Sequence, residues 1–144
     1  MKKIYKCLCI ILALSLCFSS TAYAAENDSV RSSKFFISSS VWLTRISDNQ
    51  FRACFDVTCF GIMDEVGART IRIQKSSDGV NWTTIITYSK DTSTYLIDYN
   101  TAGHGTCVTY IGTPGCYYRA VVVLYAKNSS GIGEMTEYSS MLLL

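Results

Sequence analysis

Hydrophobic and polar residues alternate along much of this chain, most clearly between residues 116 and 126. One set of alternate positions is wholly apolar and consists of Tyr118, Ala120, Val122, Leu124 and Ala126. The other set is mixed and consists of Tyr117, Arg119, Val121, Val123 and Tyr125. Successive side chains of a strand point to opposite faces of a sheet. The pattern therefore predicts a strand with one face in a core and the other partly in solvent.

Similar segments recur along the chain with turn-forming residues between them. Strands are predicted at 35–46, 51–60, 70–75, 82–88, 107–111, 116–126 and 133–141, with a short one at 95–97. Residues 61–67 and 102–105 contain glycine and predict loops. No segment has the periodicity of an amphipathic helix. Seven or eight short strands predict an all-β fold, a single antiparallel β-sandwich domain over residues 34–144.

The first 24 residues have the composition of a secretory signal peptide. Lys2, Lys3 and Lys6 precede an apolar run over 7–18, and Ala22-Tyr23-Ala24 supplies the small residues that signal peptidase reads. The run is shorter than the roughly 20 residues that a membrane span needs. We expect cleavage after Ala24, a flexible N-terminal segment at 25–33, and a secreted, extracellular protein.

Removal of this leader changes the charge of the chain. The whole sequence has 13 Lys+Arg and 11 Asp+Glu, and the leader contains three of the basic residues and none of the acidic ones. The mature chain would carry ten basic residues against eleven acidic ones, a net charge of −1. It has no basic run of the kind that binds polyanions, so neither nucleic acid nor a membrane is an expected partner.

Four cysteines follow the leader: Cys54, Cys59, Cys107 and Cys116. In an exported protein they predict at least one disulfide. If 51–60 is one regular strand, Cys54 and Cys59 lie about 16 Å apart, whereas a bridge needs Cα atoms within roughly 7 Å. Cys107 and Cys116 flank a turn and could close a short loop, and Cys54 could pair with either of them across strands. The pairing stays open. A structural zinc site is less favoured, because only the first of the two cysteine spacings suits it.

Candidate catalytic groups are few. His104 is the sole histidine and lies in a predicted loop three residues before Cys107, so we interpret it as solvated rather than as part of a Cys–His nucleophile pair. Asp56, Asp98 and Asp64-Glu65 are carboxylates that a hydrolase could use, but nothing in the sequence places two of them across a cleft. Phosphate-binding, nucleophile-elbow and zinc-protease motifs are absent. We therefore expect no catalytic residue, no metal and no cofactor.

Aromatic residues give the one positive indication of function. Beyond the leader, the chain keeps eight of its ten tyrosines and both tryptophans. These side chains combine apolar area with a hydrogen-bonding tip, which suits contact with protein or glycan. Tyr117 and Tyr125 share the face of 116–126 opposite the predicted core, so they are the candidate ligand-binding residues. Strands also favour tyrosine for packing alone, which is the alternative interpretation.

Three segments resemble parts of fibronectin type III and related immunoglobulin-like domains. Residues 118–122 and 126–133 resemble the sixth strand of that family and the turn after it, and Ser77-Asp78-Gly79-Val80-Asn81-Trp82 resembles its turn between the third and fourth strands. The resemblance implies a sandwich in which Tyr117 or Tyr118 is the tyrosine-corner residue, with its hydroxyl bonded to backbone. Phe55-Asp56-Val57-Thr58 together with residues 63–68 is also similar to a group of small exported Gram-positive bacterial proteins with no assigned activity.

These features predict a secreted, non-enzymatic module, either a recognition domain or a cell-envelope accessory protein. Its partner would be a glycan, a cell wall or a protein surface. A structural secreted protein without a soluble ligand is the alternative within the same class. A small hydrolase that uses acidic residues such as Asp64 is the rival from a different class.

Overall fold

Seven antiparallel strands and one turn of 3-10 helix account for the described part of the chain. The computed structural model describes residues 34–144, so the expected leader at 1–24 and the segment at 25–33 lie outside it. The elements are β1 (Phe36–Ser47), β2 (Gln50–Ser76), β3 (Thr83–Ser89), η1 (Thr94–Leu96), β4 (Ile97–Ile111), β5 (Tyr117–Asn128), β6 (Gly131–Tyr138) and β7 (Leu142–Leu143). Within residues 34–144, no helix has the length and apolar character needed to cross a bilayer.

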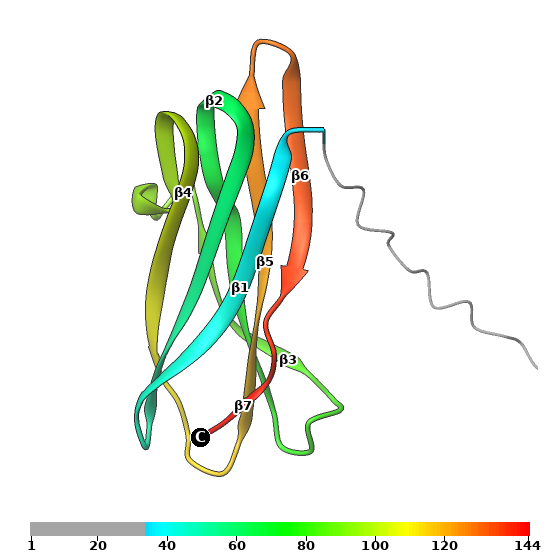
Figure 1. Cartoon of the computed structure of the whole chain (residues 1–144). Coiled ribbons are helices and arrows are strands. Elements are labelled where there is room, and N and C mark those ends of the chain that lie inside the picture. Colours follow the sequence, from blue (N-terminus) through cyan, green and yellow to red (C-terminus); the bar gives the residue numbers. More distant parts are fainter. Residues whose placement is uncertain (1–33) are drawn as a thin grey trace, which may run out of the picture.

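Two long strands, β2 and β4, each run through both arms of a curled sheet. The first half of β2 pairs with β1 and with residues 103–111 of β4. Its second half pairs with β3, with β5 and with residues 97–101 of β4. Figure 1 shows both strands turning over at the upper end of the molecule. We call β1 with residues 50–58 and 103–111 the first arm. The second arm is residues 63–76 and 97–101 with β3, β5 and β6.

The bend of β2 occurs at a glycine. Its register with β4 is interrupted between Thr58 and Met63, and Gly61 between them has a φ of 93°, which favours glycine. The loops expected at 61–67 and 102–105 are therefore wrong, because both segments lie inside strands that continue pairing beyond the bend. Glycine marks a change of strand direction here, as at a β-bulge, and not an exit from the sheet.

The all-β, antiparallel expectation is confirmed, whereas a sandwich is not. Hydrogen bonding is continuous through the bends, so the strands form one seven-stranded sheet in the order β1-β2-β5-β6, with β3 and β4 on β2 and β7 on β5. This sheet curls into a half-barrel with the two arms facing each other (Figure 1).

The core fills the space between the arms. The first arm contributes alternate residues of β2, namely Phe51, Ala53, Phe55 and Val57. The second arm contributes the apolar face that the sequence predicted in β5, namely Tyr118, Ala120, Val122, Leu124 and Ala126. All of these are nearly inaccessible to solvent. Burying a side chain of valine or leucine size contributes about 1.5–3 kcal/mol, so this interior is the main stabilising feature of the fold.

Side-chain hydrogen bonds join the arms along the two sides of the curl. On one side, Ser39 Oγ in β1 donates to Glu137 Oε1 in β6 at 2.7 Å. On the other side, His104 Nε2 in the first arm bonds the carbonyl oxygen of Tyr95 at 2.9 Å, in η1 directly before the 97–101 part of the second arm. His104 is thus half-buried within a strand, and the expectation of a solvated loop histidine is wrong.

Candidate functional site

One disulfide forms among the four candidate cysteines. Cys54 and Cys107 are directly paired residues of β2 and β4, with Cα atoms 4.1 Å apart. The expectation of at least one bridge is confirmed, and the pairing is one of the cross-strand options. Cys59 and Cys116 are free. Burial raises the pKa of the Cys59 thiol, so it stays protonated and poorly nucleophilic. Within residues 34–144, no cluster of three or more His, Cys, Asp or Glu is arranged to hold a metal ion.

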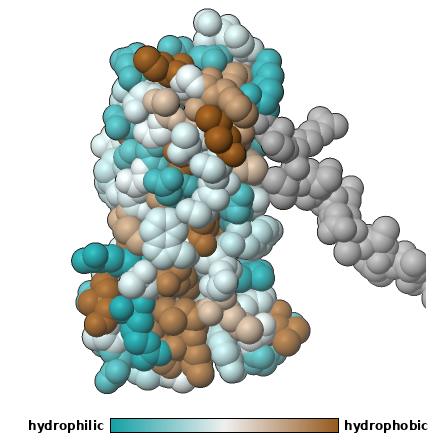
Figure 2. Space-filling model, viewed as in Figure 1, coloured by the Kyte–Doolittle hydropathy of each residue, from teal (hydrophilic) through white to brown (hydrophobic). Residues whose placement is uncertain are grey.

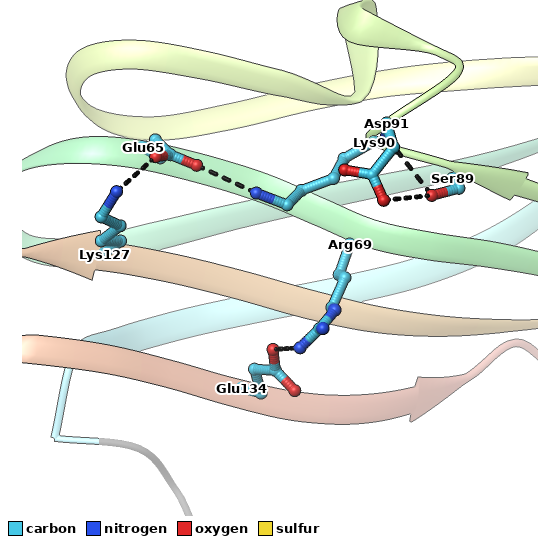
Figure 3. A network of polar contacts seen from close by, with 7 residues as sticks. All are labelled: Glu65, Arg69, Ser89, Lys90, Asp91, Lys127 and Glu134. Carbon is cyan, nitrogen blue, oxygen red and sulfur yellow. Dashed lines mark hydrogen bonds and ion pairs between the residues drawn. The ribbon is translucent and has the colours of Figure 1, made fainter.

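The candidate carboxylates do not assemble into a catalytic pair. Glu65 accepts hydrogen bonds from Lys127 Nζ at 2.8 Å and from Lys90 Nζ at 3.1 Å, as Figure 3 shows. The hydrogen bond from Lys127, supported by Lys90, lowers the pKa of Glu65, although burial acts in the opposite direction. Asp64 is exposed, and Glu65 chiefly, with Asp64 to a smaller extent, raises the pKa of Lys127. Glu65 is therefore an ion-pair residue held by two lysines and not one of two opposed catalytic carboxyl groups.

The two tyrosines singled out in the sequence have different surroundings. Tyr125 is only 4 % exposed, and Lys90 Nζ lies 4.4 Å from its ring centroid. The expectation of an exposed ring at this position is wrong, because the segment that follows β3 covers it. Tyr117 is half-buried at the start of β5. Ligand binding by these residues stays a prediction, and Tyr117 is the one that keeps surface for contact.

Three side chains stack on the outer face of the second arm: Trp82, Arg119 and Tyr138. Arg119 extends from β5, Trp82 immediately precedes β3, and Tyr138 is the last residue of β6. The Arg119 Cζ atom lies 4.4 Å from the Trp82 ring centroid and 5.5 Å from the Tyr138 ring centroid. Such cation–π contacts stabilise by about 0.5–1 kcal/mol each at exposed sites. Because Tyr138 is 58 % exposed, this group, which we call the stack, is open to solvent.

Polar contacts orient the arginine of the stack. Arg119 Nε donates to Gln74 Oε1 at 2.7 Å, and Gln74 Nε2 donates to Thr84 Oγ1 at 3.2 Å. The two Nη groups of Arg119 have no hydrogen-bond partner among residues 34–144. The Arg119 guanidinium is therefore held in place by the hydrogen bond from Nε and by the two aromatic rings. Its two Nη groups remain available to donate hydrogen bonds to a ligand.

Sequence reasoning placed Arg119 on the mixed face of its strand but did not find the stack. The stack requires β6 to pair with β5 and the turn before β3 to bring Trp82 across β2, and both depend on long-range pairing. The only sequence signal for the stack was the large number of aromatic residues, because Trp82 and Tyr138 are two of them.

Exposed apolar side chains gather at both ends of the curl. Phe60 and Ile62 flank the bend of β2, and Ile111 and Met141 lie near the opposite end. Figure 2 shows brown areas toward both ends of the visible face, with a mostly pale and teal surface between them. Apolar residues of this kind are common on the surfaces of single domains and identify no partner by themselves.

Tyr118, one of the two candidates for the tyrosine corner, makes a hydrogen bond between its hydroxyl and the backbone, as the resemblance implies. The hydroxyl of Tyr118 accepts a hydrogen bond from the backbone N–H of Thr113 at 2.7 Å, and Tyr118 itself is buried. This bond fixes the connection between β4 and β5. It does not by itself show the family.

Comparison with known proteins identifies no family. No family model matches the chain, and no curated protein matches it. Among solved structures, the sporulation control protein Spo0M from Bacillus subtilis matches at 9 % identity, over 73 % of this chain and 47 % of that one, with a TM-score of 0.44. The chain therefore spans about half the length of that protein. A match this distant carries no argument about function, and the resemblance to fibronectin type III and immunoglobulin-like domains is unconfirmed.

Proposed function

We propose that this protein is an exported, non-enzymatic recognition module that binds a polysaccharide or cell-wall surface. The binding site is the stack of Trp82, Arg119 and Tyr138, extended by the neighbouring Tyr117. The observation that carries the proposal is the stack itself, in which Arg119 lies within 4.4 Å of one ring centroid and 5.5 Å of another on a solvent-facing sheet.

The arrangement suits recognition because it is fixed before a ligand arrives. Each member extends from a strand or from the residue directly before one, and the hydrogen bond to Gln74 further fixes Arg119. A site on rigid elements loses little conformational entropy on binding. Tryptophan and tyrosine also offer flat apolar faces with polar tips, which match the apolar faces and hydroxyls of sugar rings.

The stack packs partly on the sheet and is partly free. The main core lies on the opposite face of β5, between the two arms, whereas on the outer face Tyr138 is the cross-strand partner of the buried Val121. Tyr138 is nevertheless 58 % exposed, so much of its ring remains available for contact with a ligand. The hydrolase alternative has less support, because the carboxylate of Glu65 is engaged by two lysines.

Retention on insoluble material tests the proposal. Purified protein is incubated with insoluble polysaccharides and isolated cell walls, and the bound fraction is measured against concentration. We expect saturable retention that is lost in Trp82→Ala and in Tyr138→Ala. Trp42→Ala is the matched control, because Trp42 is 42 % exposed on β1 in the first arm. Absence of retention on every surface, or an equal loss in Trp42→Ala, contradicts the proposal and favours a protein partner or a structural role.

A further inference from the structure

The cations on the outer face of the second arm fall into two groups. In the first group each cation has a carboxylate partner: Arg69 pairs with Glu134, and Lys90 and Lys127 pair with Glu65 (Figure 3). In the second group, Arg72 and Arg119 have no carboxylate partner among residues 34–144. This face therefore has positive charge that the protein does not neutralise, concentrated at two arginines.

The two arginines are neighbours in the sheet. Arg72 in β2 pairs with Val121, and Gln74, two residues further along, pairs with Arg119. Arg72 and Arg119 are thus diagonal neighbours on one face, at a spacing of roughly 7–8 Å that long side chains can bridge. Like charges on such neighbours repel each other, and an anion between them would remove the repulsion.

Arg72 also has a donor that the protein leaves unused. Its Nε atom is buried and has no hydrogen-bond partner among residues 34–144. A buried donor without a partner is unfavourable, and a rotation of the Arg72 side chain that brings Nε to a ligand atom would relieve this cost. With the Nη groups of Arg119, the site offers several unpaired donors on two guanidinium groups.

We propose that Arg72 and Arg119 bind an oxyanion, a carboxylate or a phosphate, carried by an anionic polysaccharide. Guanidinium groups recognise both oxyanions through paired N–H donors, and these charge-assisted hydrogen bonds are stronger than neutral ones. The proposal rests on the proposed function, because it names the ligand class of the same surface. In this arrangement Trp82 and Tyr138 hold the Arg119 guanidinium in position and contact the sugar ring that carries the anion.

Charge complementarity at this site is local and does not depend on net charge. The neighbouring cations are each paired with Glu65 or Glu134, so the arginine pair is the unneutralised part of the face. A protein that bound polyanions through general positive charge would show a basic stripe, which this chain lacks. We therefore expect the anionic group of the ligand to bind at one position on this face, between Arg72 and Arg119.

Two matched pairs of polymers test the inference. Polygalacturonate is compared with its methyl ester, and phosphorylated dextran with dextran, at about 0.15 M salt, where exposed charges are screened beyond about 8 Å. In each pair the sugar backbone is the same and only the anion differs. We expect at least one charged polymer to bind about ten-fold more tightly than its neutral counterpart, and the pair that responds identifies carboxylate or phosphate as the recognised group.

Arginine variants assign this preference to the site. Arg119→Gln and Arg72→Gln should each remove most of the ten-fold preference, and Arg119→Lys should also weaken it, because lysine keeps the charge but not the planar fork. Arg52→Gln is the control: it removes one positive charge from an exposed arginine in the first arm and should leave binding within about two-fold of wild type. Thermal unfolding of each variant confirms that it is folded.

The outcomes separate this inference from the proposed function. Equal binding to charged and neutral polymers that Trp82→Ala abolishes overturns the inference and leaves the proposed function intact. An equal loss in Arg52→Gln and Arg119→Gln also overturns it, because binding would then reflect general charge. No binding to any of the four polymers overturns the inference, and failure on cell walls as well overturns the proposed function with it.

Discussion

Loss of the Cys54–Cys107 disulfide should lower the free energy of unfolding by an amount that depends on the length of the loop it closes. The bridge joins residues separated by 53 positions, one in the first half of β2 and the other in β4. In the chain-entropy model, opening a loop of this length returns about 14 cal/mol/K to the unfolded chain, or about 4 kcal/mol at 25 °C. The unfolded state gains this freedom, and the paired strands of the native state need not move.

Urea unfolding measures this loss. The oxidised protein is compared with the reduced protein and with the double variant Cys54→Ala/Cys107→Ala. With an m-value of about 2 kcal/mol/M in urea, a loss of about 4 kcal/mol lowers the unfolding midpoint by about 2 M. In a thermal scan the same loss lowers Tm by about 15 °C for a domain of this size. Cys116→Ala is the control, because Cys116 is free and half-buried.

A small effect would refute the reasoning. If peptide mapping shows the Cys54–Cys107 bond in the oxidised protein and its loss costs less than about 1 kcal/mol, loop closure does not govern the stability of this fold. A cost in Cys116→Ala as large as in the double variant would also refute it, because the effect would then reflect removal of thiol volume.

Three further predictions concern backbone, charge and thiols. Gly67→Ala should lower the free energy of unfolding in urea by more than about 2 kcal/mol, because the φ of Gly67 is 150° and a Cβ would lie 2.0 Å from a backbone carbonyl oxygen. Gly61→Ala should lower it by only about 1 kcal/mol, because a Cβ there meets no atom within 4 Å. Equal losses in the two variants contradict this. Glu65→Gln should cost about 1 kcal/mol at pH 7. The lysine contacts lower the pKa of Glu65, so this difference from wild type should shrink as the pH falls below about 4.5 and glutamate becomes protonated. A constant difference argues against the ion pairs. Iodoacetamide should label Cys116 faster than Cys59 in the folded protein, because burial shields the Cys59 thiol and raises its pKa; equal rates in mass spectrometry are the contrary result.

The strands were predictable from sequence where one face is apolar. The alternation in 116–126 identified the core face of β5 correctly, because period-two burial is a local property of a strand. The bends of β2 and β4 were interpreted as loops, since a glycine that redirects a strand has the same local signature as one that ends it. What distinguishes the two is whether pairing resumes beyond the bend, and that depends on residues tens of positions away.

The candidate site was predictable only in part for the same reason. The sequence placed Tyr117, Arg119 and Tyr125 on one face of a strand. It could not show that Lys90 covers Tyr125 or that Trp82 and Tyr138 enclose Arg119, because each contact joins separate elements. The disulfide pairing was open for a similar reason, since the register of β2 against β4 decides it.

The central claim is that a ligand binds at the outer face of the second arm. Fluorescence of single-tryptophan variants tests this claim most directly. The chain has two tryptophans, Trp82 in the stack and Trp42 on β1 in the first arm. Trp42→Phe leaves Trp82 as the only reporter, and Trp82→Phe leaves Trp42. Each variant is titrated with the polysaccharide or cell-wall fragment that retains the wild-type protein. The account predicts a saturable change in Trp82 emission and no change in Trp42 emission. A response from Trp42 alone, or no response from Trp82 while the ligand is bound, would contradict it.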